Sequence, residues 1–427
     1  MRDRLIRIST AFAVFLAAVK LLIRRVKQFI FPPPREVPIG GSVADQFKPV
    51  EQAFRKNLTS GWEPDGAALA IYHKGKLVVD LYGGYADAEA KRPWKADTLN
   101  IAFSSSKAVG ALCVAMLVDR DLLTYDTLIV DFWPEFGQKG KETLTVNQVL
   151  SHMAGLAYIE TPITPEIVAD PALMSKVIEE AVPNWTPGKA VGYHAVTYGW
   201  IVDQIVRRVD PQKRSLGQFY RDEIKGDYDF HLGLPITEAH RVTRLRNAGI
   251  LQSISEFCTN PNAINYPRYI HDFLTDGPLS KVERNPDWLR FLKGMTLNNP
   301  EYYTLEQCAF LGIGTARALA ALFDKALIQK QLFQKQSTLD ALLKPFVTMP
   351  DVITGALVPR GQGLMFTPYG NTTLIGHAGY GGQNVRVDLE RELVFVYLSN
   401  GLKAGFGDSA RTYLKLRDSI YDCFNAV

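Results

Sequence analysis

The chain has 427 residues, of which 47% are hydrophobic and 22% are charged, and its net charge is +4 at pH 7. This length is enough for a large core and two structural lobes, and the composition is ordinary for a globular protein. So small a charge gives no strong field, and we therefore discount nucleic acid as a partner. The cysteines, Cys113, Cys258, Cys308 and Cys423, are too far apart for a zinc ribbon or a redox motif.

Residues 1–35 form a basic and hydrophobic segment. Arginines precede an apolar stretch over residues 8–19, and Lys20 and further basic residues follow it. The stretch is shorter than the roughly 20 residues that span a bilayer, although Arg7 and Lys20 could lie at the two interfaces. We expect a membrane anchor, as a transmembrane helix, or a secretory signal; a mitochondrial targeting segment and a peripheral helix are the alternatives. Pro32 to Pro34 end any helix, and the soluble body follows.

The body begins with two β-rich runs on either side of a glycine-containing turn, HKGK at residues 73–76. This pattern predicts antiparallel strands over about 67–73 and 76–83. After Ser106 the apolar residues recur with the period of a helix, which places Ser104 at or just before a helix N-terminus. The unsatisfied N–H groups of a first helical turn favour negative charge that develops nearby.

From there to about residue 345 the chain is mainly helical, with TVNQVLSHMAGL, YGWIVDQIVRRV and GTARALAALFDKALIQKQLF as the clearest stretches. Short β-rich runs and an amphipathic helix, DSARTYLKLRDSIYDCF, follow. We predict an α/β (α+β) fold: one antiparallel sheet from the N- and C-terminal segments, flanked by helices, with an inserted mainly helical lobe. The domain covers 45–427, with a sheet lobe over about 45–106 and 345–427 and a helical lobe over about 107–344. A cleft between the lobes is the expected place for a site.

Ser104 and Lys107 are about one helical turn apart, so their side chains project from one side of a helix start. A desolvated lysine can lose its proton and accept one from the serine, which is otherwise a poor nucleophile. Taken alone, the S-x-x-K pattern is better explained by a helix cap and a solvated lysine. Ser105 and Ser106 are rival nucleophiles, but only Ser104 has a lysine three residues later.

Two later patterns change that balance. Tyr193 lies in a glycine-preceded loop, WTPGKAVGYHAVTYGW, and His377-Ala378-Gly379 lies at an expected strand in LIGHAGYGGQ. With S-x-x-K after an N-terminal hairpin, this order resembles the penicillin-binding-protein and serine β-lactamase superfamily, and most of all its class C, esterase and D-aminopeptidase-like branch. LTVNQVLSHMAGL and GHAGYGGQNVRVDLERELVFVYLSN are similar to further segments of the superfamily. The likeness covers about residues 50–425.

The resemblance implies roles for the matching positions. Ser104 would be the acylated nucleophile and Lys107 its base or proton relay, while Tyr193 would share the base role and protonate the leaving group. Ala195 stands where the tyrosine motif of β-lactamases carries asparagine, which removes an amide that contacts the substrate there. His194 could partly replace that amide, but a satisfied loop histidine is at least as good an interpretation.

The late strand is expected to contribute to substrate binding. His377 takes the first position of the Lys-Thr-Gly motif, where many esterase-like relatives also carry histidine, and it weakens recognition of a carboxylate. The resemblance places the oxyanion hole at the backbone N–H groups of Ser104 and Tyr380. Gly379 would let the substrate backbone approach the strand edge.

Three other patterns carry no predicted chemistry. Ser151 and His152 are neighbours, and neighbours on a helix do not face one another. GYGG around Tyr380 is no phosphate loop, because no helix follows it. We find no metal-binding cluster, since the histidines are dispersed: His73, His152, His194, His231, His240, His271 and His377.

The sequence thus predicts a serine hydrolase that forms an acyl-enzyme at Ser104, acts on an ester or a peptide-like amide and is not an efficient β-lactamase. The alternative is a catalytically silent protein used for binding or scaffolding, which Ala195 favours and the joint presence of Ser104, Lys107 and Tyr193 opposes. We expect no metal or organic cofactor and a small-molecule or peptide-like acyl substrate. We also expect membrane association through the N-terminus, with the mitochondrion as the alternative location. The oligomeric state stays open.

Overall fold

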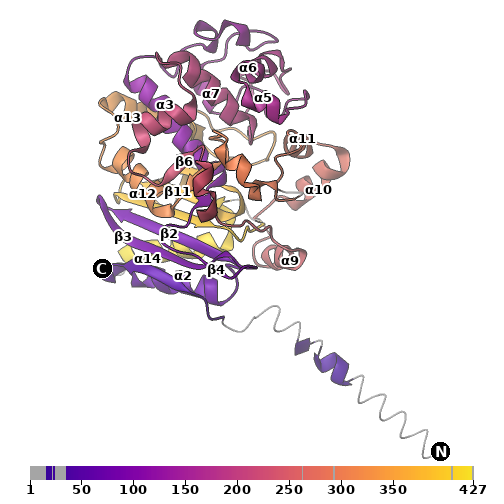
Figure 1. Cartoon of the computed structure of the whole chain (residues 1–427), viewed down its shortest axis with the longest axis vertical. Coiled ribbons are helices and arrows are strands. Elements are labelled where there is room, and N and C mark those ends of the chain that lie inside the picture. The colour runs from indigo at the N-terminus through magenta and orange to yellow at the C-terminus, as the bar shows by residue number, and fades with distance from the viewer. Residues whose placement is uncertain are drawn as a thin grey trace, which may run out of the picture.

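The computed structural model describes residues 16–21, 23–24, 35–261, 263–291, 294–404 and 407–425. Its body is built on an antiparallel sheet that combines strands from both ends of the chain, as predicted (Figure 1). In order across the sheet the strands are β1 (Ile39–Val43), β3 (Lys76–Asp87), β2 (Gly66–His73), β12 (Leu393–Ser399), β11 (Asn384–Asp388), β10 (Thr372–Ala378), β9 (Leu364–Tyr369) and β8 (Arg360–Gly361), and β4 (Arg92–Pro93) pairs with β3.

The β2–β3 hairpin confirms the two strands predicted near the N-terminus. Its turn residues Lys74 and Gly75 have φ angles of 52° and 75°. Positive φ at both central residues matches the right-handed twist of a hairpin, and glycine adopts it without strain. The other edge of β2 pairs with β12 from Ala67 opposite Ser399 to His73 opposite Leu393, and this pairing joins the two ends of the chain.

Helices cover both faces of the sheet (Figure 1). The helices α2 (Lys48–Thr59) and α14 (Arg411–Asn425) pack on one face, over a core that includes Phe54 and Phe395. On the other face lie α12 (Ala316–Phe323) and α3 (Ser106–Asp119). Every residue of α3 up to Leu117 is buried, because the helix runs through the main core between the sheet and the other helices. A helix that is apolar all round belongs in such a place.

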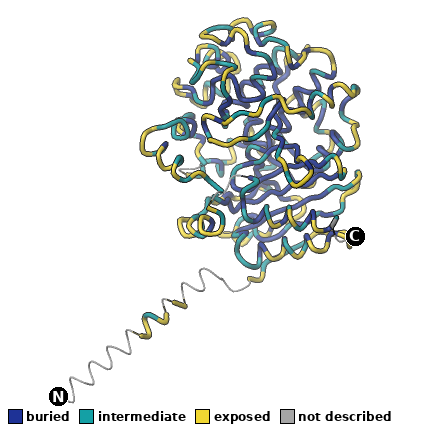
Figure 2. The backbone as a smooth tube through the Cα atoms, turned by 180° about the vertical axis from the view of Figure 1, so that it is seen from behind, coloured by how far each residue is buried: buried dark blue, intermediate teal, exposed yellow. Residues whose placement is uncertain are grey.

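Most of the inserted lobe forms the upper part of the body, and the strands of the large sheet lie in the lower part (Figure 1). Buried residues fill the interior of the body, and exposed residues lie at its surface (Figure 2). The remaining helices of the inserted lobe are α4 (Val146–Leu150), α5 (Pro165–Ala169), α6 (Pro171–Glu180), α7 (Thr197–Val209), α8 (Leu216–Tyr220), α9 (Ile250–Thr259), α10 (Tyr266–Thr275), α11 (Pro278–Arg284) and α13 (Gln336–Leu342). It also contains a small antiparallel sheet in the order β5 (Asn100–Ile101), β7 (Gly312–Gly314) and β6 (Phe230–Leu232). Strands of two or three residues are too short to show an alternating pattern, so the sequence did not predict them.

Two predicted helices are shorter in the structure. The stretch TVNQVLSHMAGL is helical only over α4, because His152 and Gly155 have φ angles of 66° and 77°, which a right-handed helix does not allow. The stretch that begins at Gly314 forms α12 as far as Phe323 and then continues as a wider π-turn. Both segments keep their apolar side chains in the core.

Among the described residues, no helix is long and apolar enough to cross a membrane. Most residues of the predicted anchor lie outside the described part of the chain. Of residues 1–34, the structure describes 16–21 and 23–24. From Arg35 onward the chain is attached to the body, since the Arg35 guanidinium donates to the carbonyls of Leu58, Glu63 and Pro64.

Candidate active site

Ser104 lies on a 3₁₀ turn, Phe103–Ser105, that leads directly into α3, as predicted. Phe103 is buried and has a φ of 46°, a conformation that costs a bulky residue roughly 1–2 kcal/mol. Such strain persists only where the surrounding packing imposes it, and it is concentrated at functional sites. The turn therefore holds Ser104 in a position that the local sequence alone would not choose.

The three adjacent serines have different surroundings. The Ser105 hydroxyl donates to the carbonyl of His377 over 3.1 Å. The Ser106 hydroxyl donates to the carbonyl of Phe103 over 2.5 Å and accepts the N–H of Gly312 over 2.8 Å. Both side chains are buried, whereas Ser104 is half-buried. Ser105 and Ser106 thus hold the turn in place, and Ser104 is the serine that remains for chemistry.

Lys107 is fully buried on the first turn of α3. Its Nζ donates to the carbonyl of Ala195 over 2.9 Å and to that of Ala309 over 2.8 Å. Nζ also lies 4.7 Å from the centre of the Tyr193 ring. Burial lowers the pKa of Lys107 to about 7. A neutral amine has two N–H groups, which the two carbonyls accept, and one lone pair that can accept a proton.

Tyr193 lies beside Ser104, and their side chains interact. Burial raises the pKa of the Tyr193 hydroxyl, and the interaction with Ser104 opposes this rise. The ring is also in contact with His152, with the two ring centres 4.8 Å apart. Tyr193 is therefore a neutral proton donor and acceptor that lies near both the candidate nucleophile and the candidate base.

Asp351 holds the loop that carries Tyr193, and sequence reasoning missed this residue. Its carboxylate accepts the backbone N–H of Tyr193 over 3.2 Å and those of Ile353 and Thr354 over 2.9 Å. Arg360 forms an ion pair with it over 3.0 Å, and both side chains are buried. The only signal was the Pro-Asp turn MPDVITG, which is typical of many surface loops.

The end of β10 is attached to the Ser104 turn through the motif predicted there. A Cβ atom on Gly379 would lie 2.7 Å from the carbonyl oxygen of Ala102 and 3.2 Å from the Ser105 hydroxyl. Glycine is thus required by contact with the nucleophile turn, in addition to any need of the substrate. The ring of Tyr380 packs against Phe103 and Phe291, with ring centres 5.5 and 5.4 Å apart. These rings give the surroundings of Ser104 an aromatic wall.

His377 is buried on β10, and its Nδ1 donates to the carbonyl of Ala378 over 2.6 Å. Burial, followed by the nearby charge of Lys107, holds the pKa of His377 well below its usual value. The ring is thus neutral, with its other nitrogen as an acceptor. It offers no positive charge to a substrate carboxylate, in agreement with the expectation from the sequence.

His194 is a loop histidine whose two ring nitrogens are both hydrogen-bonded, in agreement with one of the two interpretations of the sequence. Its Nδ1 donates to the carbonyl of Gly192 over 2.6 Å, and its Nε2 accepts the N–H of Leu156 over 2.9 Å. Burial lowers the pKa of His194 to about 3. Both ring nitrogens are occupied by backbone groups, so His194 does not replace the missing asparagine amide. His152 has a structural role too, since its Nδ1 accepts the N–H of His194 and its ring supports Tyr193.

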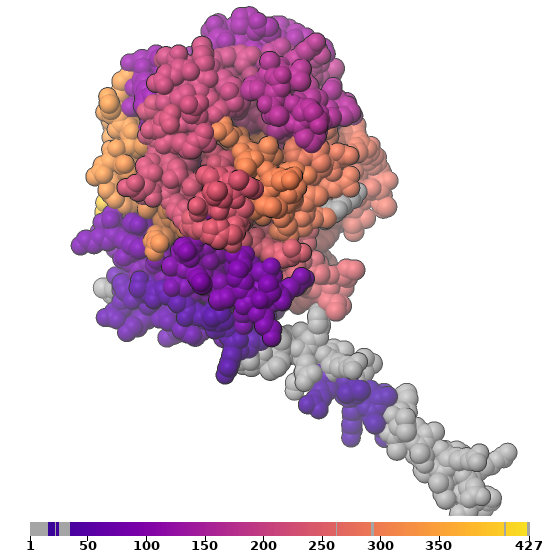
Figure 3. All heavy atoms as spheres, viewed as in Figure 1, coloured from indigo at the N-terminus to yellow at the C-terminus, as the bar shows by residue number. Residues whose placement is uncertain are grey.

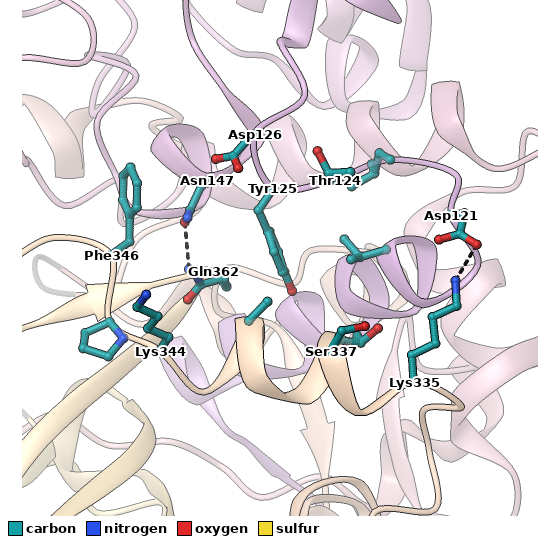
Figure 4. Close-up of a pocket in the computed structure, with 15 residues that line it drawn as sticks. Asp121, Thr124, Tyr125, Asp126, Asn147, Lys335, Ser337, Lys344, Phe346 and Gln362 are labelled. Carbon is teal, nitrogen blue, oxygen red and sulfur yellow. Dashed lines mark hydrogen bonds and ion pairs between the residues drawn. The ribbon is translucent and has the colours of Figure 1, made fainter.

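A large cavity of about 610 Å³ lies away from these residues (Figure 4). Its labelled lining residues include Tyr125, Asn147, Gln362 and Lys344, and none of the predicted site residues lines it. Among the described residues, no group of three or more histidine, cysteine, aspartate or glutamate side chains could hold a metal ion. The arrangement that can act on a substrate is therefore the cluster of Ser104, Lys107 and Tyr193.

Comparison with known proteins places this cluster in a family, because residues 52–418 match the Beta-lactamase family. The chain belongs to the beta-lactamase family. It is 30% identical over 373 residues to the Esterase/beta-lactamase LipL of Mycobacterium tuberculosis, which covers 85% of this chain and 83% of that protein. As a family member with this cluster, the chain is a serine hydrolase.

Solved structures agree with this assignment. A family VIII carboxylesterase has a TM-score of 0.77 and 26% sequence identity, over 90% of this chain and 100% of that one. A penicillin-binding protein homolog from Caulobacter crescentus has a TM-score of 0.75 and 31% identity, also over 90% of this chain and 100% of that one. The predicted superfamily and its fold are thus confirmed over most of the chain.

Proposed function

We propose that this beta-lactamase family member is an esterase that forms an acyl-enzyme at Ser104. The observation that carries the proposal is that Tyr193 interacts with Ser104 and lies beside a buried Lys107, whose Nζ is 4.7 Å from the centre of the tyrosine ring and whose pKa is lowered to about 7. A base with a pKa near neutrality is matched to general-base work at the pH of most cells. The printed names of relatives, an esterase/beta-lactamase and a family VIII carboxylesterase, support an ester as the substrate.

In the proposed reaction the Ser104 hydroxyl oxygen attacks the ester carbonyl carbon. The hydroxyl proton passes to the neutral Lys107, either directly or through Tyr193. The backbone N–H groups of Ser104 and Tyr380 stabilise the oxyanion that forms. The bond to the leaving alcohol then breaks, and Tyr193 delivers a proton to the departing oxygen. Water attacks the acyl-enzyme by the same route in reverse and releases the acid.

Two features favour an ester over a β-lactam or a peptide with a free carboxylate. Ala195 has no side-chain amide to bind a substrate amide, and the neutral His377 offers no charge to a carboxylate. The aromatic wall of Phe103, Phe291 and Tyr380 suits an apolar acyl or alcohol group. An ester also has a better leaving group than an amide, so the reaction asks less of the proton donor.

The test is covalent labelling of the purified full chain with a fluorophosphonate probe, read by intact mass and peptide mapping. We expect one adduct on Ser104, which should be absent in Ser104→Ala. The adduct should be retained in Ser105→Ala, because the Ser105 hydroxyl of the wild type only donates to the His377 carbonyl. p-Nitrophenyl butyrate should be hydrolysed at least 100-fold faster than a chromogenic cephalosporin. If no Ser104-dependent adduct forms, the proposal fails in favour of a catalytically silent binding or scaffolding protein.

We further propose that residues 1–35 attach the protein to a membrane. The apolar stretch and its flanking arginines and lysines support this, because such a segment combines burial in lipid with attraction to anionic headgroups. Residues 1–40 fused to a fluorescent protein test it in cells. Signal at a secretory or plasma membrane agrees with the proposal, whereas signal in mitochondria assigns the segment to targeting, and diffuse signal rejects both.

A further inference from the structure

Helices α9 and α10 present their apolar side chains to the outside. Ile250 is 80% exposed and Leu274 is 81% exposed. Six of the seventeen large apolar side chains that are exposed in the described part of the chain lie within these two helices: Ile250, Leu251, Ile254, Phe257, Ile270 and Leu274. On α9 the four fall within about 120° of the helix circumference, since each residue turns the helix by about 100°. They form one continuous stripe.

One carboxylate of each of these helices faces the body. Glu256 is buried on α9, and its carboxylate accepts the N–H of Ala404 over 2.6 Å. Asp272 is buried on α10 and accepts the N–H of Leu279 over 3.2 Å. A helix on the surface of a soluble protein normally has the opposite orientation, with its apolar side inward. The fold thus turns a buried carboxylate of each helix toward the body and leaves the six exposed apolar side chains for another partner.

The stripe lies close to the point at which the N-terminal segment joins the body. At the end of α9 the Asn260 side chain donates to the carbonyl of Ser409 over 3.2 Å. Two residues later, Arg411 stacks on the ring of Trp62. Arg35 is bonded to the carbonyls of Glu63 and Pro64, which directly follow Trp62. In Figures 1 and 3, α9 and its neighbouring residues protrude at the lower end of the body, beside the sheet.

We propose that the exposed apolar sides of α9 and α10 rest on the surface of a lipid bilayer. A bilayer is the one partner that matches both neighbouring features: an apolar, basic segment of about 30 residues that enters the body at Arg35, and an apolar stripe without charged residues on its outer side. Large exposed apolar patches mark interaction sites, and a stripe of uncharged side chains fits the boundary between headgroups and acyl chains.

The same helices are connected to the candidate active site. The Arg268 guanidinium on α10 donates to the carbonyl of Val352, next to Asp351, which holds the Tyr193 loop. Tyr269 on α10 is close to Tyr380. Burial is the main cause of the raised pKa of the Tyr269 hydroxyl, and Tyr380 is the next cause. A bilayer under α9 and α10 would therefore lie next to the acyl site. This second step rests on the proposed function: the substrate would be an ester taken from the membrane.

The experiment is vesicle flotation with the full chain and vesicles of phosphatidylcholine and phosphatidylglycerol. It is run at roughly 0.15 M and 1 M NaCl, because high salt shortens the Debye length and weakens the contribution of the basic N-terminus. The variant Ile254→Glu/Leu274→Glu places one charge on each helix. The matched control is Leu173→Glu/Val182→Glu, which changes two exposed apolar residues at α6 and just after it.

We expect the vesicle partition coefficient of the α9–α10 variant to fall at least ten-fold at high salt and that of the control to stay within two-fold. Unchanged partitioning of the α9–α10 variant overturns the proposal. The proposal is also overturned if the variant changes from dimer to monomer in light scattering and still binds vesicles. That result would assign the stripe to contact with a second copy of the chain. Fluorophosphonate labelling and hydrolysis of a soluble short ester separate the two proposals. If wild type shows neither labelling nor hydrolysis, the proposed esterase function fails. Loss of partitioning in the α9–α10 variant would still support the docking surface.

Discussion

Lys107 and Lys403 are both buried, with 0% and 1% of their surface exposed, but their surroundings differ. Lys107 is held by two backbone carbonyls, of Ala195 and Ala309. Lys403 forms an ion pair with the buried carboxylate of Glu63 and also donates to the Ser399 hydroxyl over 2.7 Å. Burial lowers the pKa of both lysines, but at Lys403 the charge and hydrogen bond of Glu63 oppose this fall.

The difference shows how one residue type serves two purposes in one protein. Neutral carbonyls orient the amine of Lys107 without supplying a negative charge, so its pKa falls to about 7, as the proposed base requires. A carboxylate beside Lys403 stabilises its charged form, and the pair is bonded to Tyr397 and Ser399 near the end of β12. Burial without a counterion is therefore what lets the pKa of Lys107 fall to about 7, as its proposed role as a base requires.

The largest expected effect is on catalysis at Lys107. Lys107→Met retains the length of the side chain and removes the base, so we expect kcat/KM for a soluble ester to fall by about 10²–10⁴-fold. Thermal unfolding should occur at the same or a higher temperature, because a buried amine without a counterion is lost. Steady-state kinetics and calorimetry measure both. Activity within ten-fold of wild type would remove Lys107 from the mechanism.

Lys403→Met should have the opposite result. It leaves the Glu63 carboxylate buried without its partner, which costs about 3–5 kcal/mol in similar cases. The folded-state pKa of Glu63, already raised to about 7 by burial, should rise further above its unfolded value of 4.5. The loss of stability should therefore be small below about pH 7, where Glu63 is protonated in both folded proteins, and should grow as the pH rises above 7. Urea unfolding at several pH values measures it.

The additional change Glu63→Gln in Lys403→Met should restore part of that stability, because no buried charge is then left. Equal stability of Lys403→Met and wild type at pH 8 would contradict the assigned role of the pair. The kcat of the folded fraction should change less than ten-fold in either variant.

A third test gives Lys107 the counterion that Lys403 has. Cys308 is buried and close enough to influence the pKa of Lys107. In wild type, kcat/KM should rise with pH through an apparent pKa near 7, as Lys107 loses its proton. Cys308→Asp should move this limb upward by about one unit or more, so activity at pH 7 falls by about ten-fold. Cys308→Asn is the uncharged control, and a limb that moves equally in both variants would reject the explanation.

The smallest effect is expected at Asp351, which positions Tyr193 without touching the substrate. Asp351→Asn keeps the shape but weakens the hold on three N–H groups and on Arg360. We expect kcat to fall by about three- to ten-fold with KM within two-fold and the pH limb unmoved. Asp351→Glu should recover less than half of the loss, because the turn has no room for a longer side chain. A shifted pH limb would instead assign Asp351 a direct effect on the base.

Much of the site could be predicted from the sequence because its first pair is local. Ser104 and Lys107 are three residues apart on one helix start, and their common side follows from helix geometry. Tyr193 and His377 were predicted only through a resemblance to a family. Asp351 could not be predicted, because an aspartate in a turn becomes a buried support only when a distant loop packs on it.

The inverted orientation of α9 is a second case. The residues of ILQSISEFCT have the spacing of a helix with one apolar side, and such a side ordinarily predicts contact with the core. The structure places Glu256 inward, where its carboxylate accepts the N–H of Ala404, and Ile250 outward. The sequence pattern identifies the two sides of a helix, but only the packing of other segments decides which side is exposed.

The sequence by itself determined the hairpin, the helix that begins beside Ser104 and the position of the serine–lysine pair, since each depends on residues close together in the chain. The tertiary structure decided the chemistry of that pair. The carbonyl of Ala309, 202 residues from Lys107, and the rings and strands around it remove water and supply no negative charge. Desolvation is a property of the packed surroundings, and those surroundings come from segments that only the fold brings together.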